Sequence, residues 1–436
     1  MSVVKELPNG WNLVQFSDVC EIVSGKNQKD VVNDSGAYPI YGSGGKMGYA
    51  NDYLCDPGTT IVGRKGTINK PIFVKDKFWN VDTAFGLSPY DGINKLLFHF
   101  FCLSFNFKSL DKSTTIPSLA KTDLLQIEFP LPPLPEQHRI VAKIEELFSD
   151  LDKGIESLKT AQGQLKTYRQ AVLKYAFEGK LTNKNVKDGE LPEGWKREKL
   201  LDMCDFITKG TTPPANKLYP LKGDVPFLKV YNLMFNGCLD FSINPTFVSV
   251  DTHKNMLARS KVIPGDVLMN IVGPPLGKVS IVPALFPEWN INQAIVRFRC
   301  KEALFNKYLS SFLQADRTIR AYSRKAKATA GQFNLTLEIC REIDIPLPET
   351  LEEQHLIVSE IESRLSVCDK MEESITQSLV QAEALRQSIL KKAFEGRLVP
   401  QDPNDLPASV LLERIRAERE KNNAMKAAKP RRAGMK

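Results

Sequence analysis

Six short loops hold the residues best suited to chemistry in this sequence of 436 residues, and most of them combine glycine with lysine, arginine, asparagine or threonine. They lie at residues 24–29, 43–46, 63–67, 208–212, 229–232 and 277–278. Glycine lets a backbone approach a surface closely, and the polar side chains can donate hydrogen bonds to phosphates and base edges. The pattern favours nucleic-acid recognition, although ordinary solvated loops would have the same composition. The candidate DNA-binding residues are Lys26, Asn27, Gln28, Lys46, Arg64, Lys65, Thr67, Lys209, Thr211, Thr212, Lys229, Asn232 and Lys278.

A second candidate is a basic stripe in the second half of the chain. Arg317, Arg320, Arg324 and Lys327 would share one face of a helix there. Such a row of cations could follow a phosphate backbone. A charged, solvated helix face is the alternative.

The motifs of common enzyme classes are missing or incomplete. Residues 42–48 and 273–278 contain glycines, but neither has the spacing of a phosphate-binding or dinucleotide-binding loop. Residues 244–247 (Asn-Pro-Thr-Phe) resemble the Asn-Pro-Pro-Phe signature of adenine amino-methyltransferases, but the second proline and a glycine-rich cofactor loop are missing. Four histidines leave little material for metal or triad chemistry. The sequence predicts no catalytic residue, no metal site and no cofactor of its own.

Composition restricts the class of protein further. Hydrophobic residues at 42% and charged residues at 25% indicate a globular chain, and its net charge of +8 permits nucleic-acid binding without demonstrating it. No apolar run reaches the length of about 18 residues that a membrane helix needs. The eight cysteines are scattered without a Cys-x-x-Cys motif, and the N-terminus has no secretory core. We therefore predict a cytoplasmic protein with reduced thiols and no membrane segment.

The chain contains an internal repeat. Residues 7–11 (Leu-Pro-Asn-Gly-Trp) recur as Leu-Pro-Glu-Gly-Trp at 191–195, and 22 of the 46 positions in 136–181 are identical in 353–398. The segments between them, about 20–115 and about 205–330, differ in length and share little sequence. Faint matches there pair Pro57-Gly58 with Pro264-Gly265, and residues 79–81 with 289–291. Two similar frames with different inserts indicate a pseudo-dimer and not a solenoid, which needs several alike repeats.

Each insert is predicted to be a compact α+β domain with many loops, and a long helix is predicted to follow it. A proline-rich stop at 130–135 or 346–348 ends the insert. Apolar positions then recur at spacings of three and four, from Phe148 to Ala176 and from Leu365 to Ala393, as in a heptad seam with polar interruptions. A helix over residues 137–178 would be about 60 Å long, and a glycine follows each helix where a C-terminal stop is expected. The two helices most simply pack on each other; two unrelated amphipathic helices on separate cores are the alternative.

These features together resemble the specificity subunit of type I restriction–modification enzymes. The resemblance rests on the doubled Leu-Pro-x-Gly-Trp openings, the divergent inserts, the Pro-Leu-Pro and Glu-Gln-His segments before each helix, and the Ala-Phe-Glu-Gly segments after it. Residues 398–404 and 408–414 are also similar to the family's C-terminus, so the resemblance covers essentially the whole chain.

The resemblance implies an α+β fold with an internal pseudo-two-fold repeat, in which two target recognition domains are separated by two long helices that form an antiparallel coiled coil. The implied segments are a first recognition domain (1–135), a first long helix (136–181), a second recognition domain (182–350), a second long helix (351–398) and a basic C-terminal tail or helix (399–436).

It also implies the partners. Each recognition domain would read one half of a split site in double-stranded DNA, and the helices would dock two modification subunits, which restriction–translocase subunits then join. S-adenosylmethionine, ATP and Mg²⁺ would be used by those partner subunits. The candidate partner-binding residues are Glu136, Gln137, His138, Phe177, Glu353, Gln354, His355 and Phe394. A free-standing DNA-binding regulator and an adaptor that binds only proteins are the alternative functions.

Overall fold

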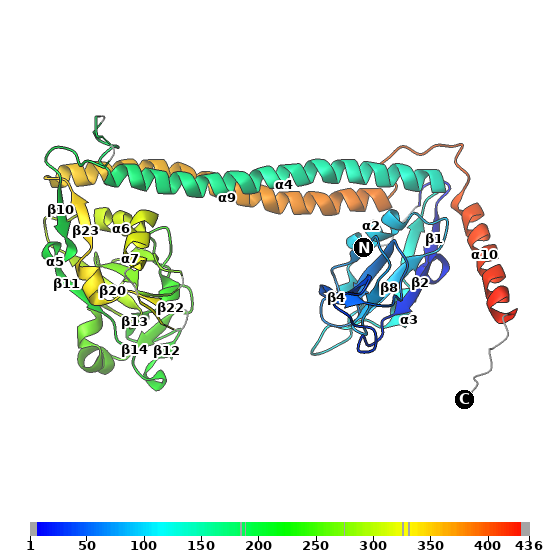
Figure 1. Ribbon diagram of the computed structural model, residues 1–436, viewed down its shortest axis with the longest axis horizontal. Coiled ribbons are helices and arrows are strands. Elements are labelled where there is room, and N and C mark those ends of the chain that lie inside the picture. Colours follow the sequence, from blue (N-terminus) through cyan, green and yellow to red (C-terminus); the bar gives the residue numbers. More distant parts are fainter. Residues whose placement is uncertain are drawn as a thin grey trace. The chain divides into compact units, whose positions relative to one another are not determined.

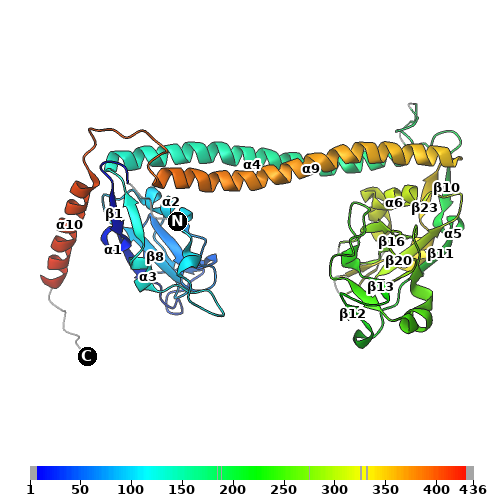
Figure 2. The same ribbon diagram turned by 180° about the vertical axis from the view of Figure 1, so that it is seen from behind.

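The computed structural model describes residues 7–183, 185–187, 189–273, 275–324, 327–329 and 332–428. The chain forms two compact units. Unit 1 combines Met1–Leu158 with Gln377–Lys436, and unit 2 is Lys159–Thr376. Each unit contains a globular part and portions of both long helices, α4 (Leu134–Phe177) and α9 (Leu351–Phe394), which run side by side in opposite directions (Figures 1 and 2). The predicted α+β class and the antiparallel helix pair are confirmed.

Two equivalent ion pairs define the helix pairing within the units. In unit 2, Arg169 on α4 donates to Asp369 on α9 at 2.5 Å and to Glu372 at 3.1 Å. In unit 1, Arg386 on α9 donates to Asp152 on α4. Arg386 is the repeat counterpart of Arg169, and Asp369 is the counterpart of Asp152. The polar interruptions of the predicted seam are thus reciprocal links between the two helices, and seam residues such as Cys368 and Ile389 are buried beside them.

The globular part of unit 1 consists of three small sheets with short helices. A two-stranded sheet pairs β1 (Asn12–Gln15) antiparallel with β9 (Glu128–Leu131). A four-stranded sheet has the order β2 (Cys20–Ser24), β8 (Ala84–Pro89), β5 (Thr59–Gly63) and β6 (Ile72–Val74). A three-stranded sheet has the order β4 (Gly45–Ala50), β3 (Tyr38–Gly42) and β7 (Trp79–Asn80). The helices are α1 (Phe16–Val19), α2 (Lys95–Ser104), η1 (Phe107–Leu110) and α3 (Lys121–Leu125).

Unit 2 repeats this plan with additions. A two-stranded sheet pairs β10 (Lys196–Lys199) with β23 (Asp344–Leu347). A four-stranded sheet has the order β11 (Cys204–Lys209), β20 (Ile295–Cys300), β16 (Val267–Asn270) and β18 (Val279–Ile281). A five-stranded sheet has the order β12 (Tyr219–Pro220), β14 (Thr246–Val248), β13 (Val225–Leu228), β19 (Trp289–Ile291) and β15 (Lys261–Val262). A further sheet has the order β17 (Val272–Gly273), β22 (Gln332–Asn334) and β21 (Lys327–Thr329).

The helices of unit 2 lie between these strands and beside the long pair. They are α5 (Leu200–Met203), η2 (Ala215–Lys217), η3 (Val230–Asn232), η4 (Thr252–Met256), η5 (Ala258–Ser260), α6 (Asn306–Gln314), α7 (Asp316–Ser323) and α8 (Leu337–Arg341). Figure 2 shows α6 between the long helices and the sheet that contains β16 and β20. Helix α6 is therefore one of the elements through which the long helices pack on the globular part.

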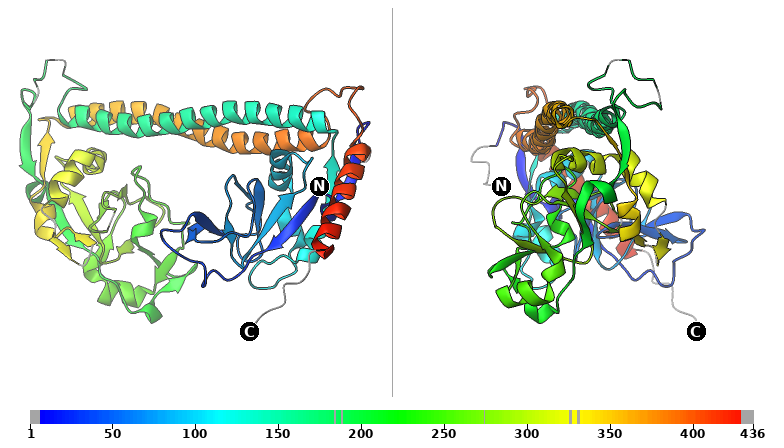
Figure 3. Two further views of the ribbon diagram at one scale, coloured as in Figure 1. Left: turned by 45° about the vertical axis from the view of Figure 1, so that its right-hand side comes forward. Right: turned by 90° about the vertical axis from the view of Figure 1, so that its left-hand side faces the viewer.

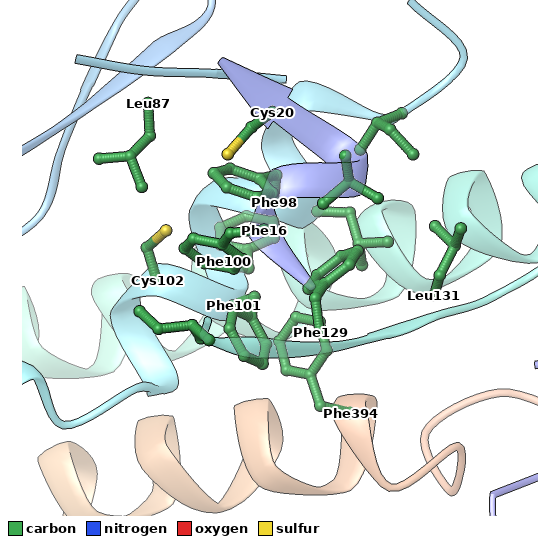
Figure 4. Packing of buried hydrophobic residues seen from close by; sticks show 14 of the residues in the cluster. Phe16, Cys20, Leu87, Phe98, Phe100, Phe101, Cys102, Phe129, Leu131 and Phe394 are labelled. Atoms are coloured by element: carbon green, nitrogen blue, oxygen red, sulfur yellow. The ribbon is translucent and has the colours of Figure 1, made fainter. Parts of the chain in front are cut away.

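The end of each long helix completes the core of the unit that contains it. In unit 1, Phe394 at the end of α9 is 2% exposed and lies 5.2 Å from Phe101 and 6.4 Å from Phe129, measured between ring centroids (Figure 4). In unit 2, Phe177 at the end of α4 lies 5.2 Å from Tyr308 and 5.1 Å from Phe312. Burying an aromatic side chain is among the largest single contributions to a core.

The glycine that follows each helix is needed for two reasons. Gly179 and Gly396 have φ angles of +72° and +67°, which L-residues with a side chain rarely adopt. A Cβ atom would lie 2.2 Å from the Pro192 ring at Gly179 and 2.1 Å from the Pro8 ring at Gly396. The Ala-Phe-Glu-Gly segment of each helix thus packs on the Leu-Pro-x-Gly-Trp segment of the same unit, which explains why both motifs occur twice.

The C-terminal segment is an extra element of unit 1. Helix α10 (Ala408–Ala428) lies along the globular part in Figure 3, where it is coloured red. Its Ile415 is buried in the core of unit 1, and Arg419 donates to the Ser17 carbonyl at 3.1 Å. Asp405, just before the helix, forms a 2.7 Å ion pair with Arg139 on α4.

We predict that Phe394→Ala lowers the free energy of unfolding of unit 1 by about 3–5 kcal/mol, because it empties a packed aromatic site. Val380→Ala is the matched control, since Val380 lies on the same helix in the same unit but is 67% exposed; it should change stability by less than about 0.5 kcal/mol. Chemical denaturation of the full chain measures both. Equal, small losses in the two variants would show that the helix end does not complete the core.

Candidate nucleic-acid interface

In unit 1 the predicted loops converge on the connection between β7 and β8. Lys26 N donates to the Asn80 carbonyl at 3.0 Å, and Arg64 N donates to the Thr83 carbonyl at 2.7 Å. Lys46 lies near the start of β4, just after the turn that joins β3 to β4, and β3 pairs with β7. Loops that are far apart in sequence therefore surround one site. Their exposed side chains are Lys26, Asn27, Lys46, Arg64, Lys65 and Thr67.

A glycine permits this convergence in each unit. A Cβ atom on Gly25 would lie 1.8 Å from the Val81 carbonyl oxygen, and one on Gly210 would lie 2.1 Å from the Ile291 carbonyl oxygen. No other residue fits such a close backbone approach.

Aromatic and apolar side chains accompany the cations of unit 1, and sequence reasoning missed them. The Lys46 ammonium donates to the Tyr49 hydroxyl at 2.6 Å and lies 3.9 Å from the centre of that ring. Met47 beside it is 62% exposed. Their closeness in sequence, within residues 46–49, was the available signal. Gln28 lies deeper in its loop, and its buried Oε1 has no hydrogen-bond partner among the described residues.

Unit 2 assembles its loops in the same way. Thr211 N donates to the Ile291 carbonyl at 3.2 Å, and the Thr212 hydroxyl accepts from Gln293 N at 3.4 Å. Lys229 follows β13, and the Lys278 ammonium reaches the carbonyl of the next residue, Val230, at 3.4 Å. Lys209 is exposed at the end of β11. The β19–β20 connection is thus also surrounded by predicted residues, namely Lys209, Thr211, Thr212, Lys229 and Lys278.

Asn232 is a correction to the predicted DNA-binding set. It is 1% exposed, and its Oδ1 accepts from Lys229 N at 2.9 Å. Its Nδ2 donates to the carbonyls of Asp240 at 3.1 Å and Ile243 at 2.8 Å. A buried amide with all these partners holds its loop together and cannot reach DNA.

Lys327 is a correction to the predicted basic stripe on one helical face. Helix α7 ends at Ser323, and Lys327 belongs to strand β21. The Arg317 guanidinium forms a 2.9 Å ion pair with Glu178, and that of Arg320 forms a 3.1 Å ion pair with Asp316. Arg324 is exposed at the end of the helix. The prediction assumed that the helix continues to Lys327, because no residue type in the sequence marks its end at Ser323.

Most of the residues predicted to bind partners hold each unit together. The Trp11 indole donates to Glu136 at 2.9 Å, and the Trp195 indole donates to Glu353 at 3.1 Å. Glu136, Gln137, Gln354, Phe177 and Phe394 are buried, so these five do not present a surface to a partner.

Gln137 and Gln354 each accept a hydrogen bond from a backbone N–H at the start of a helix of the globular part. The Gln137 side chain accepts from Asn94 N at 2.8 Å, at the start of α2. The Gln354 side chain accepts from Phe305 N at 2.9 Å, at the start of α6.

The two histidines of the set are exposed. His138 Nδ1 lies 3.2 Å from the Asn94 amide nitrogen, and the His355 ring stacks on Phe305 at 3.9 Å. They are the two exposed members of the set.

The described residues show neither a cluster of metal ligands nor a membrane-spanning helix. They contain no group of three or more His, Cys, Asp or Glu side chains that could hold a metal ion. Among the helices of those same residues, none is long and apolar enough to cross a membrane.

The fold is duplicated, with exposed polar loops around an equivalent strand connection in each unit, and comparison with known proteins identifies its class. Residues 8–160 and 192–381 match the family described as type I restriction modification DNA specificity domain. The EcoDI specificity subunit of Escherichia coli is 24% identical over 97% of this chain and 98% of that protein. The EcoBI specificity subunit of the same species is 28% identical over 73% of this chain and 70% of that protein.

Solved structures share the fold. A chain from a study of complex assembly and conformational transition in the type I restriction–modification system has a TM-score of 0.70 at 20% identity, and the match covers 90% of this chain and 99% of that one. The HsdS subunit from Thermoanaerobacter tengcongensis has a TM-score of 0.51 at 19% identity, with 90% and 98% covered.

This chain belongs to the family of type I restriction–modification specificity subunits. It supplies DNA sequence specificity and is the non-catalytic subunit of its system, whose cofactors are used by the partner subunits.

The Trp11–Glu136 contact predicts a pH-dependent stability. Burial raises the pKa of Glu136, more than the Trp11 hydrogen bond lowers it. The folded state therefore binds this proton more tightly than the unfolded chain, so the group's contribution to stability falls as pH rises above the usual glutamate range. Glu136→Gln lacks this titration. We therefore expect its free energy of unfolding, relative to that of the native protein, to increase from about pH 5 to about pH 7.

The measurement is chemical denaturation at both pH values. Glu146→Gln is the control, because Glu146 lies on the same helix but its side chain is 60% exposed. A difference between Glu136→Gln and the native protein that stays constant with pH would rule out the buried titration.

Proposed function

We propose that each unit of this specificity subunit reads its own half of a bipartite site in double-stranded DNA. The observation that carries the proposal is the convergence of exposed polar and cationic loops on the same strand connection in both units, although the loop sequences differ. A constant frame with different side chains is what two different half-sites require, because base edges are read by side chains and phosphates by cations. The sites proposed to contact DNA are the loops of Lys26, Arg64 and Lys65 in unit 1 and of Thr211, Lys229 and Lys278 in unit 2.

We further propose that the paired helices dock two modification subunits and set the distance between the half-sites. Both helices run from one unit into the other and carry long solvated faces; Val380, at 67% exposed, is one apolar residue on them. Restriction–translocase subunits would join this core, so the subunit would be needed for methylation and for cleavage. The complex would act in the cytoplasm, where the DNA is.

Exchanging one insert should change one half of the recognised site. Replacing residues 20–115 with the insert of another family member should alter one half of the methylated motif in a host that expresses the system, because the second set of loops is untouched. Replacing 205–330 is the matched exchange and should alter the other half only. Changes in both halves after a single exchange would contradict independent reading.

Lengthening both helices should lengthen the spacer. Seven residues inserted at Ala161 and seven at its repeat counterpart Ser378 keep the heptad phase and add about 10 Å. That length corresponds to about three base pairs of duplex. The half-sites should stay the same while the methylated motif gains spacer.

Four-residue insertions at the same positions shift the seam and should abolish the activity. An active seven-residue variant with an unchanged spacer would show that the helices do not set the spacer and serve only to dock partners.

A further inference from the structure

An exposed turn occupies the same structural position in both units. In unit 1 it connects β7 to β8, and Ala84 N donates to the Val81 carbonyl at 2.9 Å. In unit 2 it connects β19 to β20, and Ile295 N donates to the Asn292 carbonyl at 3.1 Å. Each is a four-residue turn closed by its first and last residues.

The surrounding hydrogen bonds establish which residues are equivalent. Three backbone bonds hold the turn in unit 1, and each has a counterpart in unit 2. In unit 1 they join Val81 N to Tyr41 O (2.9 Å), Gly25 N to Ala84 O (3.2 Å) and Arg64 N to Thr83 O (2.7 Å). In unit 2 they join Asn292 N to Leu228 O (3.0 Å), Gly210 N to Ile295 O (3.0 Å) and Ile271 N to Ala294 O (2.8 Å). Asp82 and Gln293 therefore hold the same position, the second residue of the turn.

This correspondence corrects the sequence match of residues 79–81 with 289–291. In the pairing with the neighbouring parallel strand, Ile40 faces Trp79 whereas Phe227 faces Asn290. The two strands are thus offset by one residue from their sequence match. A one-residue shift turns each side chain to the other face of a strand, so the matched tryptophans are not structural equivalents.

Asp82 and Gln293 are both exposed, and their side chains bind no other described residue. The Arg64 guanidinium donates to the main-chain carbonyl of Asp82 at 3.3 Å, and no ion pair to the Asp82 carboxylate is present among the described residues. The backbone beneath these side chains is held by hydrogen bonds to neighbouring segments. Buried Asn80, for example, donates to the carbonyls of Val23 at 3.2 Å and Ala84 at 3.3 Å.

We propose that Asp82 and Gln293 are specificity-determining residues, each of which contacts a base edge in its own half-site. This rests on the proposed reading of one half-site by each unit. A carboxylate among cations is repelled by phosphate, so Asp82 is suited to a base and Lys26, Arg64 and Lys65 to the backbone.

The side-chain chemistry selects the base class. A carboxylate only accepts hydrogen bonds, which suits the exocyclic amino group of cytosine. A carboxamide both donates and accepts, which suits the N6 and N7 atoms of adenine. Asp82 is therefore assigned a cytosine and Gln293 an adenine.

The test uses the full chain assembled with its modification subunits. Asp82→Asn and Gln293→Glu are close isosteres at exposed positions. Asp91→Asn and Glu302→Gln are the matched controls, because these exposed residues follow β8 and β20 whereas Asp82 and Gln293 precede the same strands. The readouts are the methylated motif and binding to duplexes with each base substituted in turn, with circular dichroism as a check of folding.

Asp82→Asn should reduce discrimination at one cytosine position of one half-site by roughly five- to 150-fold, and Gln293→Glu should do so at one adenine position of the other half. The controls should keep the native motif. Unchanged discrimination at every base position in both variants would overturn the assignment, whatever the change in overall affinity or its salt dependence.

A native complex that itself showed no bipartite motif would refute the proposed function instead. The measurement on the native complex therefore distinguishes a failure of the proposed function from a failure of the assignment of Asp82 and Gln293.

Discussion

The burial of Phe394 and Phe177 is the interaction on which the rest of each unit depends. Each phenylalanine ends a long helix and enters an aromatic core built by the globular part of its unit, and the glycine two residues later packs on a proline. The other long helix of the unit starts at the same globular part, where a tryptophan indole binds a buried or half-buried glutamate. Both helices are thereby attached to each globular part, one by its beginning and the other by its end.

This arrangement separates stability from recognition. The repeated motifs supply helix attachments, caps and core packing, whereas the loops around the β7–β8 and β19–β20 connections carry exposed polar side chains. Loop residues can then differ between the units without weakening the frame. The glycines at 25 and 210 are the exceptions, since each loop approaches the opposite backbone too closely for a side chain.

Much of the frame was predictable because it is periodic and repeated. The seam spacing predicted α4 and α9, and the following glycines marked their ends. Contacts between residues far apart in sequence were not predictable: the Trp11 indole meets a carboxylate 125 positions away. Phe394 and Phe177 were assigned to partners because repetition alone does not distinguish a core residue from a docking residue. Asn232 was misplaced because the sequence does not show whether a loop amide is buried or exposed. Lys327 was misplaced because the sequence does not show where the helix before it ends.

Amide hydrogen exchange of the assembled complex tests most directly whether each unit reads its own half-site. Duplexes carrying only the first half-site, only the second, or neither would be compared at one salt concentration. Independent reading predicts that the first duplex protects the loops at 63–67 and 81–84 but not the turn at 292–295, and that the second does the reverse. Equal protection of both turns by either duplex, or protection confined to the long helices, would contradict this account.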